Sequence, residues 1–266
     1  MGVERTDANY DIDAQFYDWL YSDADDVHFH LNLAKRFGGP VLEPMCGTAR
    51  LMVPLARAGF CVVGIDTHDG MLKLARENIS GENAEVRKRL ELHKMDMRDF
   101  DLKRKFKLVI VAFNGFPHLL LPADQDRAVS CMARHLDPTG ALVIAVRNLK
   151  APGTAHPEQL DMTKDLGSGH LSRYSTITEV KDHPLMRVKF RYELYPADGM
   201  IDNRESVFDI RILQANQLKA LMEGAGLCVA ESYGGHHGEP LTPKSDWIIH
   251  LARSREGQKI RIPMKA

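Results

Sequence analysis

Residues 41–50 read Val-Leu-Glu-Pro-Met-Cys-Gly-Thr-Ala-Arg, and after a helical stretch the chain continues as Cys-Val-Val-Gly-Ile-Asp at residues 61–66. The apolar start followed by Gly47 predicts a short strand that ends in a sharp turn, because glycine lets the backbone bend without a Cβ in the way. Apolar residues then recur at roughly helical spacing as far as Gly59, which occupies a helix C-cap position. The sequence therefore predicts a strand, a turn, a helix and a second strand with Asp66 at its carboxyl end.

The two acids of this stretch indicate the kind of ligand. In an open α/β sheet, ligands bind at the carboxyl ends of the strands, and an acid about 20 residues after a glycine turn can accept hydrogen bonds from a ribose diol. A pyrophosphate loop would have the pattern G-x-G-x-x-G, but only Gly47 is present here. Glu43 would repel a pyrophosphate and attract an ammonium group. A ligand with a ribose, an amino group and no phosphate fits better, and S-adenosylmethionine is such a ligand.

The residues of this stretch resemble a known family. Glu43, Cys46-Gly47-Thr48, Arg50 and Asp66, followed by Gly70-Met71-Leu72, are similar to the cofactor motif of class I S-adenosylmethionine-dependent methyltransferases, and the resemblance covers roughly residues 10–150. Two positions depart from the family pattern, which has mostly glycine at both. Met45 narrows the loop next to the methionine portion of the cofactor, and Ala49 adds a methyl group where close backbone approach is common.

Composition narrows the class of protein. The 266 residues suffice for one well-buried core, and 27% charged residues with a net charge of −1 argue against a nucleic-acid-binding surface. The four cysteines lie far apart without a C-x-x-C pair, so we expect reduced, buried thiols in a cytosol and neither a zinc cluster nor a disulfide framework. They are Cys46, Cys61, Cys131 and Cys228. No stretch of 18 apolar residues occurs, which predicts no transmembrane helix, no membrane partner and a cytoplasmic protein.

The segment 10–22 predicts an aromatic helix. Phe16, Trp19 and Leu20 fit one helical stripe, and two Tyr-Asp pairs begin at Tyr10 and Tyr17. One interpretation is that the rings pack this helix onto the domain. The other, which the resemblance implies, is a lid that covers cofactor and acceptor and excludes water. Both remain open at this point.

Hydrophobic periodicity predicts the remaining elements. Helices are expected at 25–37, 69–78, 123–136 and 214–224, and strands at 86–95, 106–113, 141–146, 227–233 and 247–252, with a turn at 138–140. Residues 150–170 predict a long loop, followed by three antiparallel strands at about 171–181, 185–195 and 203–212. The expected fold is α/β: a Rossmann-like, seven-strand, mostly parallel sheet with an antiparallel last strand and an antiparallel β insertion after strand 5.

We expect one methyltransferase domain over residues 1–266. Its parts are a helical lid (1–37), a cofactor-binding core (38–150), a loop and β insertion (151–212), the end of the core sheet (213–253) and a tail (254–266). The resemblance implies that the insertion shapes the acceptor pocket or forms a homodimer contact.

The resemblance also assigns roles to residues in the core. It implies that Asp96 meets the adenine amino group and that Met97 packs on the ring, although Asp96 also fits a solvated turn acid or a helix cap. Asn114 and His118 follow strand 106–113, and the resemblance implies that residues at this place lie beside the transferable methyl group. The full expected cofactor-binding set is Tyr10, Tyr17, Glu43, Met45, Cys46, Gly47, Arg50, Asp66, Thr67, Met71, Asp96, Met97 and Phe113.

Acceptor chemistry depends on a base. Methyl transfer from a sulfonium needs alignment and an acceptor lone pair; an amine need only be neutral, whereas a hydroxyl usually needs a general base or a metal. The candidate bases are four histidines, His118, His170, His236 and His237, of which His118 is best placed. His236 and His237 with Glu239 could bind a metal, but adjacent side chains in an extended loop point to opposite sides, so we expect none.

Arg147 lies at the end of strand 141–146 and suits a carboxylate or phosphate of the acceptor; the alternative is a salt bridge with a local acid. The expected catalytic residues are His118, Tyr17 and Tyr21. The expected acceptor ligands are Tyr21, Asn114, His118, Arg147, Tyr174 and His236.

The leading hypothesis is therefore an S-adenosylmethionine-dependent methyltransferase that acts on a small molecule and yields S-adenosylhomocysteine. Similar proteins with such an insertion include N-methyltransferases of amino sugars, glycine and other amines, so nitrogen is the first choice of acceptor atom. O- or S-methylation with a histidine base is the second. A cofactor-binding protein without catalysis, a nicotinamide oxidoreductase and a tRNA or protein methyltransferase are weaker alternatives.

Overall fold

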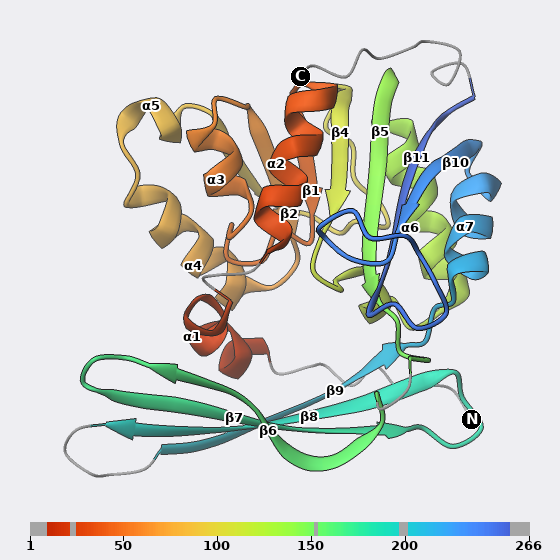
Figure 1. The fold of residues 1–266 in the computed structure, drawn as a ribbon. Coiled ribbons are helices and arrows are strands. Elements are labelled where there is room, and N and C mark those ends of the chain that lie inside the picture. Colours follow the sequence, from red (N-terminus) through yellow and green to blue (C-terminus); the bar gives the residue numbers. More distant parts are fainter. Residues whose placement is uncertain (1–9, 22–24, 152–153, 197–201, 256–266) are drawn as a thin grey trace.

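The computed structural model describes residues 10–21, 25–151, 154–196 and 202–255, and these form two sheets with helices (Figure 1). The larger sheet has seven strands in the order β10-β11-β5-β4-β1-β2-β3. The strands are β1 (Val41–Pro44), β2 (Val62–Asp66), β3 (Leu90–Lys94), β4 (Phe106–Val111), β5 (Leu136–Arg147), β10 (Leu227–Tyr233) and β11 (Trp247–Ser254). The neighbours from β3 to β5 pair in parallel, and β11 is antiparallel to both β5 and β10. The predicted Rossmann-like sheet with an antiparallel last strand is confirmed.

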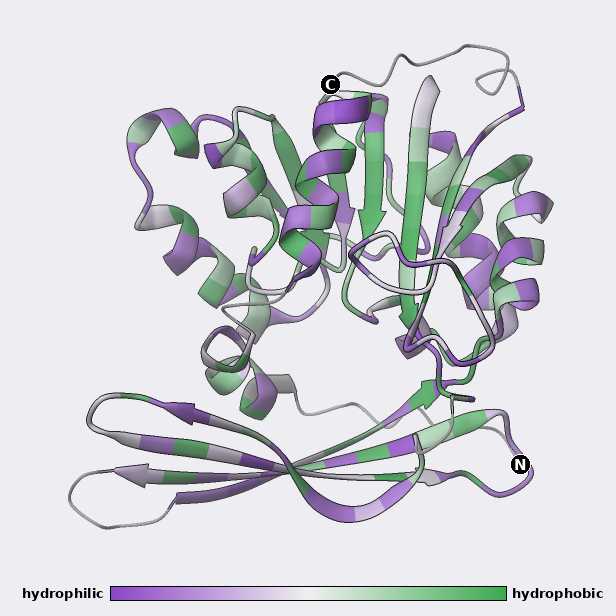
Figure 2. Ribbon diagram, viewed as in Figure 1, coloured by the Kyte–Doolittle hydropathy of each residue, from purple (hydrophilic) through white to green (hydrophobic). Residues whose placement is uncertain are grey.

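Helices cover both faces of this sheet. On one side lie α2 (Asp26–Phe37), α3 (Met52–Arg57) and α4 (Asp69–Ser80), and on the other lie α6 (Pro122–Arg134) and α7 (Ala215–Gly224). Successive residues of β4 alternate between the two layers: Leu108 and Ile110 pack towards α2, and Val109 and Val111 towards α6. All four are fully buried, which explains why the central strands read as continuous apolar runs. Figure 2 shows the resulting hydrophobic strands between helices with hydrophilic outer faces.

The turn after β1 has an unusual backbone. Gly47 has a φ of +55°, and Met45 and Ala49 also have positive φ values of 59° and 66°. This left-handed region costs a side-chain-bearing residue about 1–2 kcal/mol, so glycine is the usual occupant. Met45 and Ala49, the two positions that depart from the family motif, therefore adopt the left-handed backbone conformation that usually requires glycine. Ala49 is fully buried, and Met45 packs near the backbone of Gly115.

The second sheet lies across the carboxyl edge of the parallel strands (Figure 1). It contains β6 (His156–Asp165), β7 (Gly169–Glu179), β8 (Leu185–Pro196) and β9 (Asp202–Arg211), all antiparallel. Helix α1 (Tyr10–Leu20) sits between this β-layer and the larger sheet. Phe16 and Leu20 of α1 form a buried cluster with Leu171 and Tyr192 of the layer. The insertion therefore has a fourth strand, β6, which precedes the three strands that the sequence predicts.

The prediction of a loop over residues 150–170 was wrong because β6 is an edge strand. Its side chains are mostly exposed, so it lacks the alternating apolar pattern that marks a half-buried strand. Pro157 also sits at a gap in its pairing, between His156↔Ile177 and Gln159↔Ser175. Proline is tolerated at such edge positions because no ladder hydrogen bond is needed there.

Two smaller predictions also failed. Val86 belongs to a short helix, α5 (Ala84–Arg87), because the Asn83 side chain accepts a hydrogen bond from the Val86 N–H at 3.0 Å and caps it. Residues 138–140 lie inside β5, where the pairing with β4 jumps from Phe106↔Leu136 to Leu108↔Ala141. The chain bulges there, so the Pro-Thr-Gly sequence that predicts a turn marks an irregularity in a strand.

The four cysteines are free, but only Cys46 and Cys131 are buried; Cys61 is exposed and Cys228 is intermediate. The expectation that all four are buried was wrong, since Cys61 precedes β2 at the exposed end of the strand. Within the described part of the chain, every helix is too short or too polar to cross a bilayer.

Candidate active site

The carboxylate of Asp66 fixes the turn after β1. Its Oδ2 accepts a hydrogen bond from the Gly47 N–H and its Oδ1 accepts one from the His68 N–H, both at 2.9 Å. Asp66 ends β2 and Gly47 follows β1, so this carboxylate joins the ends of two neighbouring strands. Each oxygen retains lone-pair capacity for another donor.

Glu43, in β1, is the second acid of this edge. Its side chain is 4% exposed, and Oε2 has no hydrogen-bond partner among the described residues. Burial raises the pKa of the Glu43 carboxyl well above its usual value, and the nearby Arg50 guanidinium opposes this shift. A buried carboxyl oxygen without a donor is costly, so Glu43 is suited to a positively charged or hydrogen-bond-donating ligand.

Arg50 is already held by a protein carboxylate. Its guanidinium makes a two-point ion pair with Asp26 at 2.8 and 2.6 Å, and Asp26 is almost completely buried. The guanidinium carbon lies 4.5 Å from the centre of the Phe113 ring. Arg50 therefore braces Phe113 and the turn from the α2 side.

Aromatic rings from α1 and the loop after β4 meet at this edge. The Tyr21 ring lies 4.6 Å from that of Phe113 and 4.9 Å from that of Tyr17, and all three side chains line a cavity together with Met71. Burial raises the pKa of the Tyr17 hydroxyl above its usual value, so Tyr17 stays protonated.

Helix α1 packs on the β-layer and also contributes to the cavity lining, whereas its role as a lid over cofactor and acceptor stays a prediction. Phe16 packs against the β-layer, whereas Tyr17 and Tyr21 face the cavity; Trp19, expected on the buried stripe, is 45% exposed. Asp18 ties the helix to the turn after β1, accepting hydrogen bonds from Thr48 Oγ1 at 2.5 Å and Asn78 Nδ2 at 2.7 Å. The side chain of Tyr10 lies outside the described residues.

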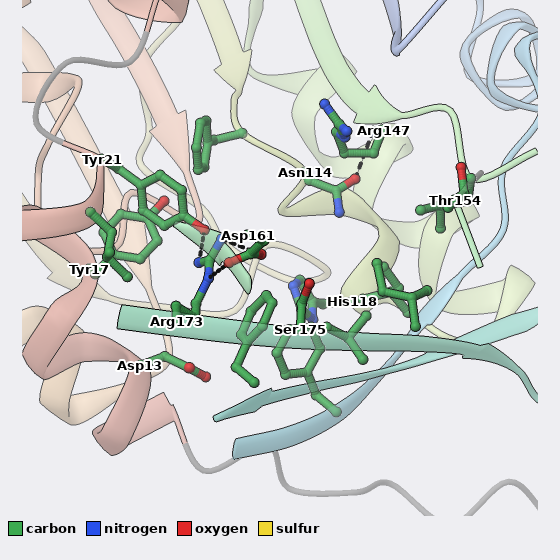
Figure 3. A pocket seen from close by; sticks show the side chains of 18 of the residues that line it. Asp13, Tyr17, Tyr21, Asn114, His118, Arg147, Thr154, Asp161, Arg173 and Ser175 are labelled. Atoms are coloured by element: carbon green, nitrogen blue, oxygen red, sulfur yellow. Dashed lines mark hydrogen bonds and ion pairs between the residues drawn. The ribbon is translucent and has the colours of Figure 1, made fainter. Parts of the chain in front are cut away.

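The cavity has a volume of about 540 Å³ and lies between the carboxyl edge and the β-layer (Figure 3). Asp13 and Tyr17 of α1 and Tyr21, which follows the helix, lie on one side of this view, and Arg147 and Thr154 lie on the other. Apolar side chains of the layer, including Ile177, Val188, Phe190, Phe208 and Ile210, line it as well. A mixed lining with a few polar groups is typical of small-molecule sites.

His118 lies in the cavity wall. It ends a short 3-10 helix, η1 (Phe116–His118), and its ring centre is 5.3 Å from that of Phe208 on β9. Burial lowers the pKa of the imidazole to about 4. The ring is therefore neutral at pH 7 and has a nitrogen that can accept a hydrogen bond.

Asn114 and Arg147 also line the cavity, as expected of acceptor ligands. The Asn114 Oδ1 accepts a hydrogen bond from the backbone N–H of Arg147 at 2.8 Å. The exposed Arg147 guanidinium lies over the Trp247 ring at 5.2 Å and makes no ion pair with any residue that the structure describes. Its alternative role, a salt bridge with a local acid, is therefore not observed within the described ranges.

Arg173 of β7 is a cavity residue that the sequence analysis missed. Its guanidinium donates hydrogen bonds to both carboxylate oxygens of Asp161, each at 3.0 Å, and to the Tyr21 hydroxyl. Tyr174, which was expected here, does not line the cavity, because alternation along the strand turns it outward, where its ring meets Arg191 at 4.1 Å. The period-two pattern of Leu171 and Ile177 could have indicated that Arg173 faces inward.

Most of the expected cofactor-binding residues do not line the cavity. They are the motif residues Glu43, Met45, Cys46, Gly47, Arg50 and Asp66, and also Thr67, Asp96 and Met97. Asp96 is paired with Arg98, which accounts for the lowered pKa of its carboxyl, and Arg98 also contacts Asp124 at 2.7 Å. Met97 is buried in the core and Thr67 is exposed after β2. Asp96 thus resembles the turn acid that was the alternative interpretation.

His236 and His237 point to different neighbours. The His236 ring lies 4.7 Å from that of Trp247 and behind the cavity wall, while His237 Nε2 lies 3.5 Å from Asp25 Oδ2. Within the described ranges, no three His, Cys, Asp or Glu side chains come together as a metal site would require.

His30 is a buried titratable group beside the site. Its ring is fully buried, and neither nitrogen has a hydrogen-bond partner among the described residues. Burial lowers the pKa of His30 from 6.5 to about 3. The folded protein therefore holds a neutral imidazole over a pH range in which the unfolded chain would protonate it.

This difference predicts a pH-dependent stability. Between pH 6 and 4 the unfolded chain binds one proton more at His30, so the free energy of unfolding should fall by about 1.4 kcal/mol per pH unit from this group alone. His30→Phe should reduce the slope by that amount, as measured by urea denaturation across this range. His28→Gln, at an exposed position of the same helix, is the matched control and should keep the wild-type slope. Equal slopes for His30→Phe and wild type would contradict the assignment.

Comparison with known proteins agrees with this geometry. Residues 41–140 match a family described as a methyltransferase domain. The chain is 28% identical over 209 residues to a dTDP-3-amino-3,6-dideoxy-alpha-D-glucopyranose N,N-dimethyltransferase of Streptomyces fradiae, covering 76% of this chain and 74% of that one. It is 27% identical over 144 residues to a dTDP-3-amino-3,4,6-trideoxy-alpha-D-glucopyranose N,N-dimethyltransferase of Streptomyces venezuelae, covering 51% and 57%. The fold is similar to that of the CcbJ methyltransferase from Streptomyces caelestis, with a TM-score of 0.76 and 21% identity over 91% of this chain and 95% of that one.

Proposed function

We propose that this chain, whose residues 41–140 match a methyltransferase-domain family, is a class I S-adenosylmethionine-dependent methyltransferase that transfers a methyl group to the amine of a small molecule, in the first place an amino sugar. The observation that carries the proposal is the pair of acids, Glu43 and Asp66, at the carboxyl ends of two neighbouring parallel strands. Neither acid lines the cavity, which lies between this edge of the sheet and the β-layer.

The residues at the carboxyl edge fit this cofactor. Glu43 has a buried oxygen that receives no hydrogen bond from any residue in the described part of the chain, which suits the ammonium group of an amino acid. Asp66 can accept further hydrogen bonds from a ribose diol while it holds the turn. A diphosphate would instead face two carboxylates. When bound, S-adenosylmethionine supplies an activated methyl group, and the residues of this chain align the acceptor with it.

The state of His118 favours nitrogen as the acceptor atom. An imidazole with a pKa of about 4 is a weak base, so it is poorly matched to removing a proton from a hydroxyl. A neutral amine needs no base before it attacks. His118 can orient the amine through a hydrogen bond, and the proton that the methylated nitrogen loses can pass to water.

Arg147 supports an acceptor with an anionic part. Its guanidinium is exposed at the cavity and lacks an ion pair among the described residues, and guanidinium groups suit phosphate. The sugar named for the Streptomyces fradiae relative carries a diphosphate. We therefore place the phosphates near Arg147 and the amine-bearing ring deeper in the cavity.

The β-layer also offers a contact between two copies of the chain, and we propose a homodimer through its outer face. Leu160 and Val207 are 54% and 42% exposed there, on strands whose neighbouring residues face the cavity. Light scattering at micromolar concentration should give twice the monomer mass for wild type and the monomer mass for Val207→Lys. A monomer in both cases would contradict the proposal.

The acceptor class is tested by methyl transfer from tritiated S-adenosylmethionine. We expect transfer to dTDP-3-amino-3,6-dideoxy-α-D-glucopyranose and little transfer to the same sugar with a hydroxyl in place of the amine. Faster methylation of the hydroxyl analogue would contradict the amine assignment.

Asp66→Ala should weaken cofactor binding by more than about tenfold, because charge-assisted hydrogen bonds are lost.

The role of His118 is tested in the same assay. His118→Ala should lower turnover of the amine by less than about tenfold, because orientation is lost but no obligatory proton transfer is. The control is His170→Ala, whose ring stacks on Tyr195 outside the cavity and should have no effect. A loss of a thousandfold or more for His118→Ala would instead indicate an essential base and favour a hydroxyl acceptor.

A further inference from the structure

Asp13 on α1 is a buried carboxylate of the cavity. It is 6% exposed and lines the cavity beside Tyr17. Its Oδ1 accepts hydrogen bonds from the Tyr192 hydroxyl at 2.5 Å and the Ser206 hydroxyl at 2.7 Å. Its Oδ2 is also buried but has no hydrogen-bond partner among the described residues. One oxygen is therefore fixed by the β-layer, and the other is left for a donor.

The surroundings of Asp13 act on its carboxyl in opposite directions. Burial raises the pKa of this carboxyl above its usual value and outweighs the Tyr192 and Ser206 hydroxyls and the Arg173 guanidinium, which lower it. Leaving a buried carboxyl oxygen unpaired costs stability. Such an arrangement is expected where a ligand completes the hydrogen bonding.

The position of Asp13 relates it to His118. Ser206, which holds Asp13, and Phe208, which contacts the His118 ring, are two residues apart on β9. They face the same side of the strand, and their Cα atoms are roughly 7 Å apart by strand geometry. Asp13 and His118 thus flank neighbouring positions of one cavity wall, and they can contact neighbouring groups of one acceptor.

The cavity also has a direction. At Asp13 it is closed, since Tyr192 and Ser206 are almost fully buried. At Arg147 and Gln159, both exposed, it opens, and Asp13 and Arg147 lie on opposite sides in Figure 3. An acceptor with its anionic part near Arg147 therefore presents its far end to Asp13.

We propose that Asp13 determines acceptor specificity: its Oδ2 accepts a hydrogen bond from a hydroxyl adjacent to the methylated amine, on the side away from the anionic part of the acceptor. The acceptor class is then a vicinal amino alcohol. This inference rests on the proposed function, because it assumes that the cavity binds the amine acceptor.

Two sugars provide a matched pair of probes, and both are named for relatives of this chain. dTDP-3-amino-3,6-dideoxy-α-D-glucopyranose has a hydroxyl at C4 beside the 3-amine, and its 3,4,6-trideoxy counterpart lacks it. Both keep the 2-hydroxyl and the diphosphate at C1. The C4 hydroxyl is the one that points away from the phosphates, so it is the group expected at Asp13.

The experiment compares kcat/KM for the two probes. Wild type should prefer the 4-hydroxyl sugar by about tenfold or more, because the deoxy sugar leaves Oδ2 unpaired. Asp13→Ala should bring the ratio close to one. Asp13→Asn retains an oxygen for Tyr192 and Ser206, preserves the docking of α1, and should reduce the ratio severalfold through loss of the charge.

Asp18→Asn is the control, because Asp18 also ties α1 to the body of the protein but does not line the cavity. It should retain the wild-type ratio even if both rates fall. A purely structural role of Asp13 would lower both rates equally, and an unchanged ratio in folded Asp13→Asn or Asp13→Ala would overturn the inference. A wild-type ratio near one would overturn it as well. Failure of wild type to methylate either sugar would overturn the amino-sugar proposal, and with it this inference.

Discussion

The hydrogen bonds that Asp66 accepts hold the functional edge of this protein together. They connect the end of β2 to the Gly47 N–H after β1 and to the His68 N–H before α4. The turn after β1 contains three residues with positive φ, two of which are not glycine. A backbone of that shape needs external support, and the Asp66 carboxylate supplies it. The same carboxylate and the buried Glu43 then form the acidic edge to which a cationic nucleoside is proposed to bind.

Helix α1 joins this edge to the β-layer. Asp18 contacts Thr48 in the turn after β1, while Tyr21 and Asp13 contact Arg173 and Tyr192 of the layer. These polar contacts lie on both sides of α1, and the buried cluster of Phe16 and Leu20 lies between them. Together they fix the positions of α1, the larger sheet and the β-layer around one cavity. Because Asp13, Tyr17 and Leu20 of α1 line this cavity, we expect changes in the sequence of α1 to alter which acceptor fits without changing the core sheet.

The sequence alone predicted the parts of the molecule in which one physical pattern dominates. The central strands were predicted because they are buried on both faces and read as apolar runs. The motif from Glu43 to Asp66 was recognised because ligands bind at the carboxyl ends of parallel strands, where its two acids lie. The edge strand β6 was missed because it buries little. Tyr174 was selected although Arg173 faces the cavity, because the choice did not follow the period-two pattern of Leu171 and Ile177, which indicates the inward side of this strand. The role of Asp13 needed the structure, since its partners, Tyr192 and Ser206, are more than 170 residues away.

The most direct test of the account is a crystal structure with S-adenosylhomocysteine bound. The account predicts the ribose hydroxyls at Asp66, the amino group within hydrogen-bond distance of Glu43, and the sulfur directed into the cavity between Tyr17 and His118. A cofactor that lies elsewhere, or a dinucleotide with its phosphates at Gly47, would contradict the central claim. That claim is that the carboxylates of Glu43 and Asp66, at the carboxyl edge of the sheet, select a cationic nucleoside.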